Sequence, residues 1–273
     1  MQDDITLSPL QTQGTWRSKS ISSLPDDFLI DAISPSIPIN RDSLELSLTE
    51  AIKDFGGNTY ILGQFREKNE NNDIDLPPMQ SMQWDGYFIS KLDPDRNSLY
   101  VNIEDQKNQF NSGWGQITLG DEGSLRFITT IDNSGGMPSQ DREDAGYQGV
   151  AADSNRAGFI TSFDASGARE WTTLVTGDDI YSYAQSMVSD KDGNAYIYYG
   201  DSSWWMPKHL SKVDVDGNIA WNQENIFDVE MNSKGASYKP YGGVVAVDGE
   251  SNPIIAAEVG NAPDVDISLW IAD

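Results

Sequence analysis

One octet of the sequence recurs four times, and it decides the fold. Its copies read GYFISKLD at 86–93, AGFITSFD at 157–164, PKHLSKVD at 207–214 and DISLWIAD at 266–273. The copies all end in Asp, but they are unevenly spaced along the chain. Insertions in the loops between repeated strands explain such spacing, so the octet predicts one strand that recurs in four structural units.

A turn and an aromatic residue follow three of the octets. The turns read PDRN, ASGA and VDGN, and Tyr100, Trp171 or Trp221 stands shortly after each of them. Asp, Asn and Gly favour tight hairpin turns, because they accept positive φ and hydrogen-bond to their own backbone. Each of these octets is therefore predicted to form a hairpin with a second strand that carries an outer aromatic residue.

A second hairpin precedes each octet. Its copies are LTEAIKDFGGNTYILGQF at 48–65, GQITLGDEGSLRFITTI at 115–131, AQSMVSDKDGNAYIYYG at 184–200 and GGVVAVDGESNPIIAAEVG at 242–260. Each copy joins two β-rich runs through a Gly- or Asn-containing turn. The unit is therefore a four-stranded antiparallel meander, and the last unit lacks its fourth strand after 273.

The N-terminus offers a candidate for that missing strand. Residues 14–21 read GTWRSKSI, and Trp16 matches the outer aromatic position of the other units. We expect residues 1–22 to form the closing strand of the last blade, which would complete a ring and remove an exposed sheet edge. The alternative is that the chain is part of a larger ring and that Trp16 is a coincidence.

The predicted fold class is all-β and β-propeller-like, as a single domain over 1–273 with about four four-stranded antiparallel blades. The blade units are 44–110, 114–176, 182–228 and 242–273. An irregular sandwich is the alternative architecture.

The motif resembles the bacterial tandem β-propeller repeats of the YVTN-like and seven-bladed-propeller types. The resemblance rests on FISKLD at 88–93, on HLSKVD at 209–214 with Gly217 and Trp221, and on DGNAY at 192–196. It covers roughly 44–273 and implies a propeller of surface or secreted proteins. The four units counted here are fewer than that family usually has, and propellers host many unrelated activities.

Composition excludes several classes of function. The 273 residues include 18 Lys plus Arg and 43 Asp plus Glu, which gives a formal charge of −25. Such a charge repels phosphates and anionic lipid, so we expect no nucleic-acid partner and no membrane insertion. With no Cys and one His, we expect neither a disulfide framework nor a multi-histidine metal centre, and no cofactor. The first thirty residues show no Sec signal peptide.

Strand parity predicts one end of the blades with tight turns and another with long, variable connections. Binding usually depends on such connections. Aromatic residues there can stack on sugar rings or anchor a protein partner, although some pack under their own loops. The candidates are Trp84, Trp114, Tyr147, Tyr181, Tyr183, Trp204, Trp205, Tyr238 and Tyr241, with the Trp204–Trp205 pair the best single choice.

The sequence singles out no catalytic or metal-ligating residue, and it leaves open whether the acidic runs 141–144 and 178–179 bind calcium. The runs DKDGN at 190–194 and DVDGN at 214–218 begin like calcium loops, but their Gly comes fourth and they occupy expected hairpin turns. His209 occupies the octet position of Phe88 and Phe159, which indicates a packed strand position. Carboxylates are too abundant for the sequence to select an acid and a base.

We therefore expect a non-enzymatic binding or assembly module: a structural or adhesive component of a phage or virus particle, or an extracellular surface protein. Its partners would be proteins in an assembly or surface glycans, with homo-oligomers possible. The alternative is a polysaccharide-acting hydrolase or lyase that uses acidic residues on the connection face.

Overall fold

The computed structural model describes residues 44–67, 86–105, 110–132, 156–175, 182–201, 208–223, 226, 240–261 and 264–271. These residues are almost entirely β: fifteen strands form four antiparallel sheets, with one 3-10 turn, η3 (Asp121–Gly123). No helix in these ranges is long and apolar enough to cross a membrane.

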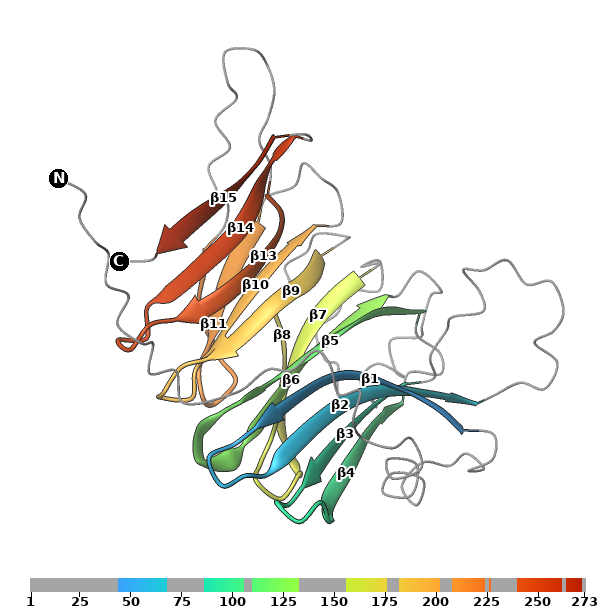
Figure 1. The fold of residues 1–273 in the computed structure, drawn as a ribbon. Coiled ribbons are helices and arrows are strands. Elements are labelled where there is room, and N and C mark those ends of the chain that lie inside the picture. The colour runs from blue at the N-terminus through green and yellow to red at the C-terminus, as the bar shows by residue number, and fades with distance from the viewer. Residues whose placement is uncertain are drawn as a thin grey trace, which may run out of the picture.

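The sheets follow one another along the chain, and we call them blades 1 to 4 (Figure 1). Blade 1 consists of β1 (Leu44–Lys53), β2 (Thr59–Glu67), β3 (Gly86–Leu92) and β4 (Ser98–Asp105). Blade 2 consists of β5 (Phe110–Leu119), β6 (Leu125–Asp132), β7 (Arg156–Phe163) and β8 (Arg169–Leu174). Blade 3 consists of β9 (Ser182–Ser189), β10 (Ala195–Asp201), β11 (Lys208–Val213) and β12 (Ile219–Gln223). Blade 4 consists of β13 (Pro240–Val247), β14 (Pro253–Asn261) and β15 (Asp264–Ile271).

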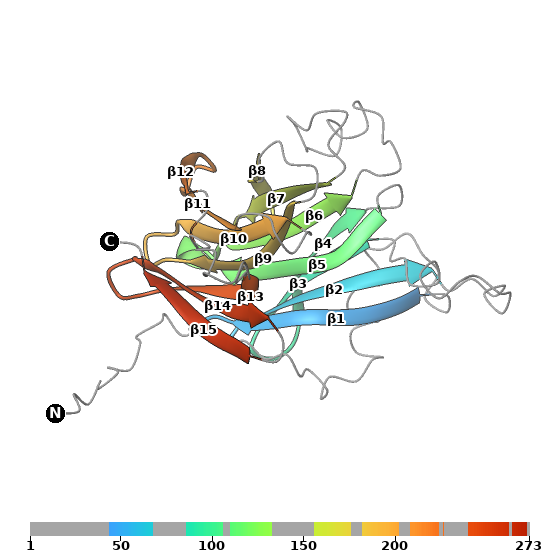
Figure 2. The same ribbon diagram turned by 90° about the horizontal axis from the view of Figure 1, so that it is seen from above.

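The arrangement is β-propeller-like, as the repeat predicts. Each octet forms the third strand of its blade, as β3, β7, β11 or β15, and pairs with the second strand of the preceding hairpin. The first strands β1, β5, β9 and β13 are neighbours in that order, so the blades radiate from a row of inner strands (Figure 2). The closing strand predicted at 1–22, with Trp16, lies outside the described residues, and ring closure stays a prediction.

The hydrophobic core lies between neighbouring blades. Blades 1 and 2 share a buried cluster in which Tyr87 meets Phe127 edge-on, with ring centroids 5.3 Å apart. Blades 2 and 3 share a second cluster that includes Ile160 and Ile197, and blades 3 and 4 share a third. Alternating strand residues point to opposite sheet faces, so each inner blade buries one set of side chains against each neighbour.

Two of the recurring outer aromatics, Tyr100 and Trp171, pack against a turn of the next blade. The Trp171 ring of blade 2 lies against Gly217 in the β11–β12 turn, and its Nε1 donates to the Val215 carbonyl at 2.9 Å. Gly217 has a φ of 85°, and an added Cβ would lie 2.6 Å from the Trp171 ring. Tyr100 of blade 1 covers Gly167 of blade 2 in the same way. Glycine is therefore needed for the positive φ and for the close aromatic contact.

A second contact between blades uses side chains on the inner strands. In each blade, the turn between the first and second strands begins at Asp54, Gly120, Asp190 or Asp248. We call the residue four positions before this turn residue the acceptor position. Glu50 there accepts a hydrogen bond from the Ile117 backbone N–H of blade 2 at 2.9 Å. Gln116 accepts likewise from Met187 at 2.9 Å, and Ser186 accepts from Val245 at 3.1 Å. One oxygen atom per blade thus satisfies an inner-strand donor of the next blade.

A third contact between blades is made by the residue six positions after the first turn residue, which we call the donor position. The Tyr60 hydroxyl donates to the Gly123 carbonyl of blade 2 at 3.3 Å. Arg126 occupies this position in blade 2, and its guanidinium donates to the carbonyl of Gly193. In blade 3 the hydroxyl of Tyr196 donates to the Ser251 carbonyl at 2.9 Å. All three junctions therefore have a hydrogen bond from the donor position to a turn carbonyl of the next blade. The donor is a Tyr hydroxyl in two junctions and an Arg guanidinium in the third.

Candidate binding face

The two ends of the blades differ in their connections. At the turn end, five-residue turns join β1 to β2, β3 to β4 and so on through β13 to β14. At the connection end, the longer segments begin and end, among them 68–85 after β2 and 133–155 after β6. Figure 1 shows the tight turns at the same end of successive blades. The predicted division into a turn end and a connection end is thus present in the strand order.

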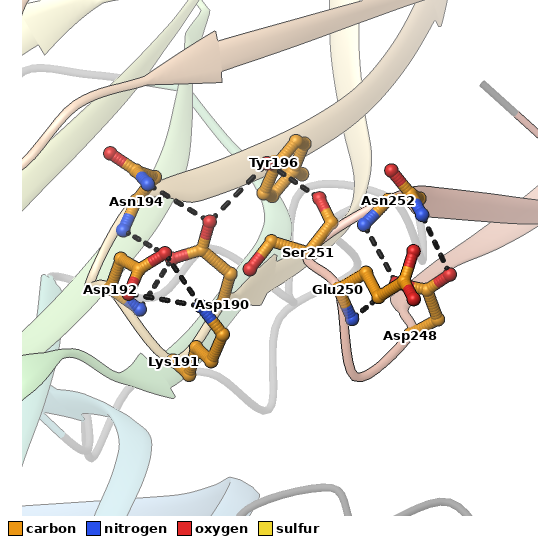
Figure 3. A network of polar contacts seen from close by, with 9 residues as sticks. All are labelled: Asp190, Lys191, Asp192, Asn194, Tyr196, Asp248, Glu250, Ser251 and Asn252. Atoms are coloured by element: carbon orange, nitrogen blue, oxygen red, sulfur yellow. Dashed lines mark hydrogen bonds and ion pairs between the residues drawn. The ribbon is translucent and has the colours of Figure 1, made fainter. Parts of the chain in front are cut away.

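At the turn end, the Asp that opens each of six turns accepts hydrogen bonds from within its own turn. In blade 3, the Asp190 carboxylate accepts from the backbone N–H groups of Asp192 and Asn194, and from the Asn194 amide at 2.9 Å (Figure 3). Asp248 accepts from Glu250 and Asn252 in the same pattern in blade 4. Tyr196 lies between the two turns and donates to Ser251. Such Asp turns stabilise the hairpins locally, which explains why Asp recurs there.

Hydrogen bonds within the turns stabilise the ionised form of these acids. Donation from the Asn97 side chain, and then from its backbone, lowers the pKa of the Asp93 carboxyl below its usual 3.8. The same effect lowers the pKa values of three further turn carboxyls, through donors led by Ser166, Asn218 and Asn252. These carboxyls are Asp164, Asp214 and Asp248. An acid held ionised in this way is a poor general acid at neutral pH.

The calcium-like runs are turns, as the sequence analysis favours. Residues 190–194 and 214–218 close the β9–β10 and β11–β12 hairpins, with Asp190 and Asp214 as the turn acceptors. Among the described residues, no three His, Cys, Asp or Glu side chains lie together in a way that could hold a metal ion. The turn end thus offers structure-forming oxygens but no preformed cation cage in these ranges.

His209 occupies a packed strand position. It lies on β11 opposite Tyr199 of β10, and the two rings stack with centroids 5.1 Å apart and planes 15° apart. The Tyr199 hydroxyl donates to Asn222 at 3.1 Å, and the His209 side chain is half-buried. The position matches the octet position of Phe88, which is fully buried. Packing accounts for His209 at this position.

Three of the candidate aromatics lie on neighbouring inner strands at the connection end. Tyr183 and Tyr241 are the second residues of β9 and β13, and Trp114 lies in the first half of β5. β9 lies between β5 and β13 and contacts both of them. The structure therefore brings the backbones of these three residues to one region of the connection end, close to the centre of the blade array. The other candidates, which are Trp84, Tyr147, Tyr181, Trp204, Trp205 and Tyr238, lie outside the described residues.

The residues at the acceptor and donor positions do not stand out in the sequence. Arg126 is the clearest case: it is buried, its guanidinium lies 5.5 Å from the Trp171 ring centre, and burial lowers its pKa. Glu50 and Gln116 share only an oxygen acceptor, while Tyr60 and Arg126 share only a donor. Counting from the turn residues would have aligned these positions, but residue identity would not have revealed their shared role.

Comparisons with known proteins found no matching family model and no matching curated protein. Solved structures with a similar fold include a polysaccharide lyase of family 25, an ulvan lyase bound to a GlcA–Rha3S saccharide. It shares 12% identity at a TM-score of 0.47, and the match covers 81% of this chain and 51% of the lyase chain. The protein thus spans about half the length of that enzyme.

Two other solved structures differ from the lyase in kind. A thermostable family-43 glycoside hydrolase shares 9% identity at a TM-score of 0.39, over 86% of this chain and 91% of its own. A tail fibre of Staphylococcus aureus phage P68 shares 12% identity at a TM-score of 0.29, over 89% of this chain and 56% of its own. These proteins have different functions, so the comparison extends to chain architecture and no further.

Proposed function

We propose that this protein is a non-enzymatic binding or assembly module that engages its partner through the connection end of the blades. The observation that supports the proposal is the placement of Trp114, Tyr183 and Tyr241 on adjacent inner strands at that end. Aromatic side chains supply large contact areas at low entropic cost, and they stack on sugars or fill pockets in partner proteins. At the opposite end, the Asp residues that open the turns accept hydrogen bonds within those turns.

The setting we propose is a phage or virus particle, or an extracellular surface. Hydrogen bonds between neighbouring blades make the scaffold rigid. A rigid scaffold lowers the entropic cost of binding through its connections, as adhesion and assembly require. With a formal charge of −25, the protein would repel acidic polymers at low salt, so neutral glycans or basic protein surfaces are the favoured partners. The competing function is a polysaccharide hydrolase or lyase that uses acids on the connection end.

A binding experiment tests the proposal. Purified protein would be screened against immobilised neutral and acidic polysaccharides and against cell envelopes, and bound ligands would then be titrated. Trp114→Ala, Tyr183→Ala and Tyr241→Ala are each expected to weaken binding by tenfold or more, in the range typical of aromatic anchors, about 1–3 kcal/mol. Phe55→Ala is the matched control, because Phe55 is an 80% exposed aromatic residue at the turn end.

The outcomes separate the two functions. Equal loss in Phe55→Ala and in the connection-end variants would contradict the placement of the site. Release of new reducing ends or of unsaturated sugars from a bound polysaccharide, abolished by substituting acids of the connection end, would favour the enzyme. Native mass measurement together with imaging of the source particle would test assembly, and a free monomer that cleaves glycans would refute it.

A further inference from the structure

Three side chains lie in a row near the turn end of each of the first three blades, on the face toward the next blade. They stand opposite one another on the second, third and fourth strands, so they share one face of the sheet. We call them the junction row. The rows are Tyr60, Lys91 and Tyr100 in blade 1; Arg126, Ser162 and Trp171 in blade 2; and Tyr196, Lys212 and Trp221 in blade 3.

In blades 1 and 3, the middle residue of the row is a lysine beside aromatic rings. The buried Lys91 has its Nζ 5.0 Å from the ring centre of Tyr60 and 5.9 Å from that of Tyr100. The Nζ of Lys212 lies 5.2 Å from the ring centre of Tyr196. The face of an aromatic ring attracts a cation, most strongly where water is excluded.

In blade 2, the cation and the aromatic partner stand on other strands. The buried Arg126 lies on the second strand, and its guanidinium reaches across the row to 5.5 Å from the Trp171 ring centre. Between them stands Ser162, whose hydroxyl donates to the Glu170 carboxylate at 2.9 Å. A lysine at 162 would place a second cation beside Arg126, whereas the small neutral serine leaves space for the guanidinium.

The acceptors on the next blade stay the same while the donors change. Besides the first-turn carbonyl that the donor position reaches, the carbonyl of the second residue in the other turn accepts a hydrogen bond. Ala165 of blade 2 accepts there from Lys91 Nζ at 3.0 Å, and Val215 of blade 3 accepts from Trp171 Nε1 at 2.9 Å. Blade 2 thus binds both turns of blade 3 without a lysine in its row.

The cation lies among carboxylates of two blades. Burial lowers the pKa of Arg126, whereas Asp190, Glu170, Asp214 and Asp121 act in the opposite direction by favouring its charged form. Asp190 and Asp214 open turns of blade 3, while the other two acids belong to blade 2. Carboxylates of neighbouring turns repel one another, and a cation between them offsets that repulsion.

We propose that one cation in the junction row stabilises the docking of each of blades 1, 2 and 3 on the next blade, and that blade 2 supplies it from its second strand where blades 1 and 3 supply it from their third. The residues with this role are Lys91, Arg126 and Lys212. The inference does not depend on the proposed binding function.

Blade 4 departs from this pattern in its residue types. The two row positions on its described strands hold Ile254 and Ile271, which lie opposite each other, and its acceptor position holds Val244. In blade 1, Arg96 has a φ of 68° and stands where blades 2 and 3 have Gly167 and Gly217 beneath an aromatic ring. The end blades therefore do not carry the residues that join blades 1 to 2 and 2 to 3.

An exchange of residues in blade 2 tests the proposal. Arg126→Tyr with Ser162→Lys copies the row of blade 3, so the cation returns on the third strand. Each single change is expected to raise the equilibrium constant for unfolding by about tenfold or more, because it leaves the junction with no cation or with two. The double variant should return to within about threefold of the parent in urea unfolding, since the two changes compensate. Additive losses, or a double variant that does not fold although both single variants fold, would overturn the proposal.

Substitutions of Lys91 separate charge from packing in blade 1. Lys91→Met keeps the length of the side chain but loses its charge, and it should raise the unfolding equilibrium constant by about tenfold. Lys91→Arg retains a cation and should stay within about threefold of the parent, as should Lys53→Met, the control at an exposed lysine of β1. Equal losses in Lys91→Met and Lys91→Arg, or no loss in Lys91→Met, would show that the charge is not required and would overturn the proposal.

Discussion

The junction between blades 2 and 3 and the two end blades, 4 and 1, carry different side chains at equivalent positions. At the first, Arg126 reaches the Gly193 carbonyl, Gln116 accepts from Met187, and Trp171 lies on Gly217. At the second, the equivalent positions hold Ile254, Val244 and Arg96. The strand pattern alone thus makes a blade, whereas specific side chains make a junction.

The largest effect is expected at the glycine beneath Trp171. Gly217→Val places a β-branched side chain at a φ of 85° and its Cβ 2.6 Å from the indole. We expect a loss of about 2–5 kcal/mol in the free energy of unfolding, from strain and overpacking together. The matched variant Arg96→Gly, at the same turn position of blade 1, should change stability by less than about 1 kcal/mol. Urea unfolding of both variants measures the change in the free energy of unfolding. Equal changes in the two variants would contradict the prediction.

A smaller loss is expected at the donor position of blade 2. Arg126→Leu removes the hydrogen bond to the buried Gly193 carbonyl and the contact with Trp171, at a cost of about 2–4 kcal/mol. Arg126→Tyr introduces the donor that blades 1 and 3 use, so it should recover part of this loss. Thermal unfolding followed by near-UV circular dichroism would report both. If the two variants are equally unstable, the shared donor role is wrong.

The outer aromatics test ring closure. Trp221 is half-buried against the cluster of blades 3 and 4, and Trp221→Ala should cost about 2 kcal/mol. If residues 1–22 complete blade 4, Trp16→Ala should lower the melting temperature by a similar amount, and deleting 1–22 by more. An unchanged melting temperature after that deletion would refute the closing strand.

The acceptor position should show a modest effect. Gln116→Ala leaves the Met187 N–H without its side-chain partner and should cost about 1–2 kcal/mol. Gln116→Glu retains an acceptor like Glu50 of blade 1, so its stability should remain within about 0.5 kcal/mol of the parent. Chemical denaturation would rank the two. A stable Gln116→Ala protein would mean that the bond contributes nothing to the junction.

The smallest effect concerns acid stability. The pKa of the Asp214 carboxyl is lowered in the folded state, so its contribution is complete above the usual 3.8 and is lost as the pH falls below that value. Asp214→Ala should therefore make the decline of melting temperature below pH 4 shallower. High salt in both samples screens the change in overall charge. An identical decline in both proteins would refute this role of the turn.

The hairpin turns of the fold are predictable from individual Asp residues. Asp93, Asp164 and Asp214 mark hairpin turns because an Asp side chain bonds to backbone N–H groups two to four residues ahead. The candidate binding face is only partly predictable. The alternating direction of successive strands predicts that Trp114 and Tyr183 lie at the connection end. That they lie on neighbouring inner strands depends on how the blades pack.

The acceptor and donor positions could not be predicted because their chemistry is interchangeable. Glu50, Gln116 and Ser186 look unrelated in sequence, yet each provides one oxygen at the same place. Their partners lie 59 to 71 residues away along the chain. No local pattern specifies a bond over such a separation.

The sequence by itself determined the strands, the turns and the four-unit order, because these depend on alternation and on hydrogen bonds within five residues. Only the tertiary structure decided that blades 1 to 4 join through three similar junctions and that the two end blades differ. Junctions depend on which side chains from distant units meet. Arg96, Val244 and Ile254 acquire their meaning only beside the positions that they replace.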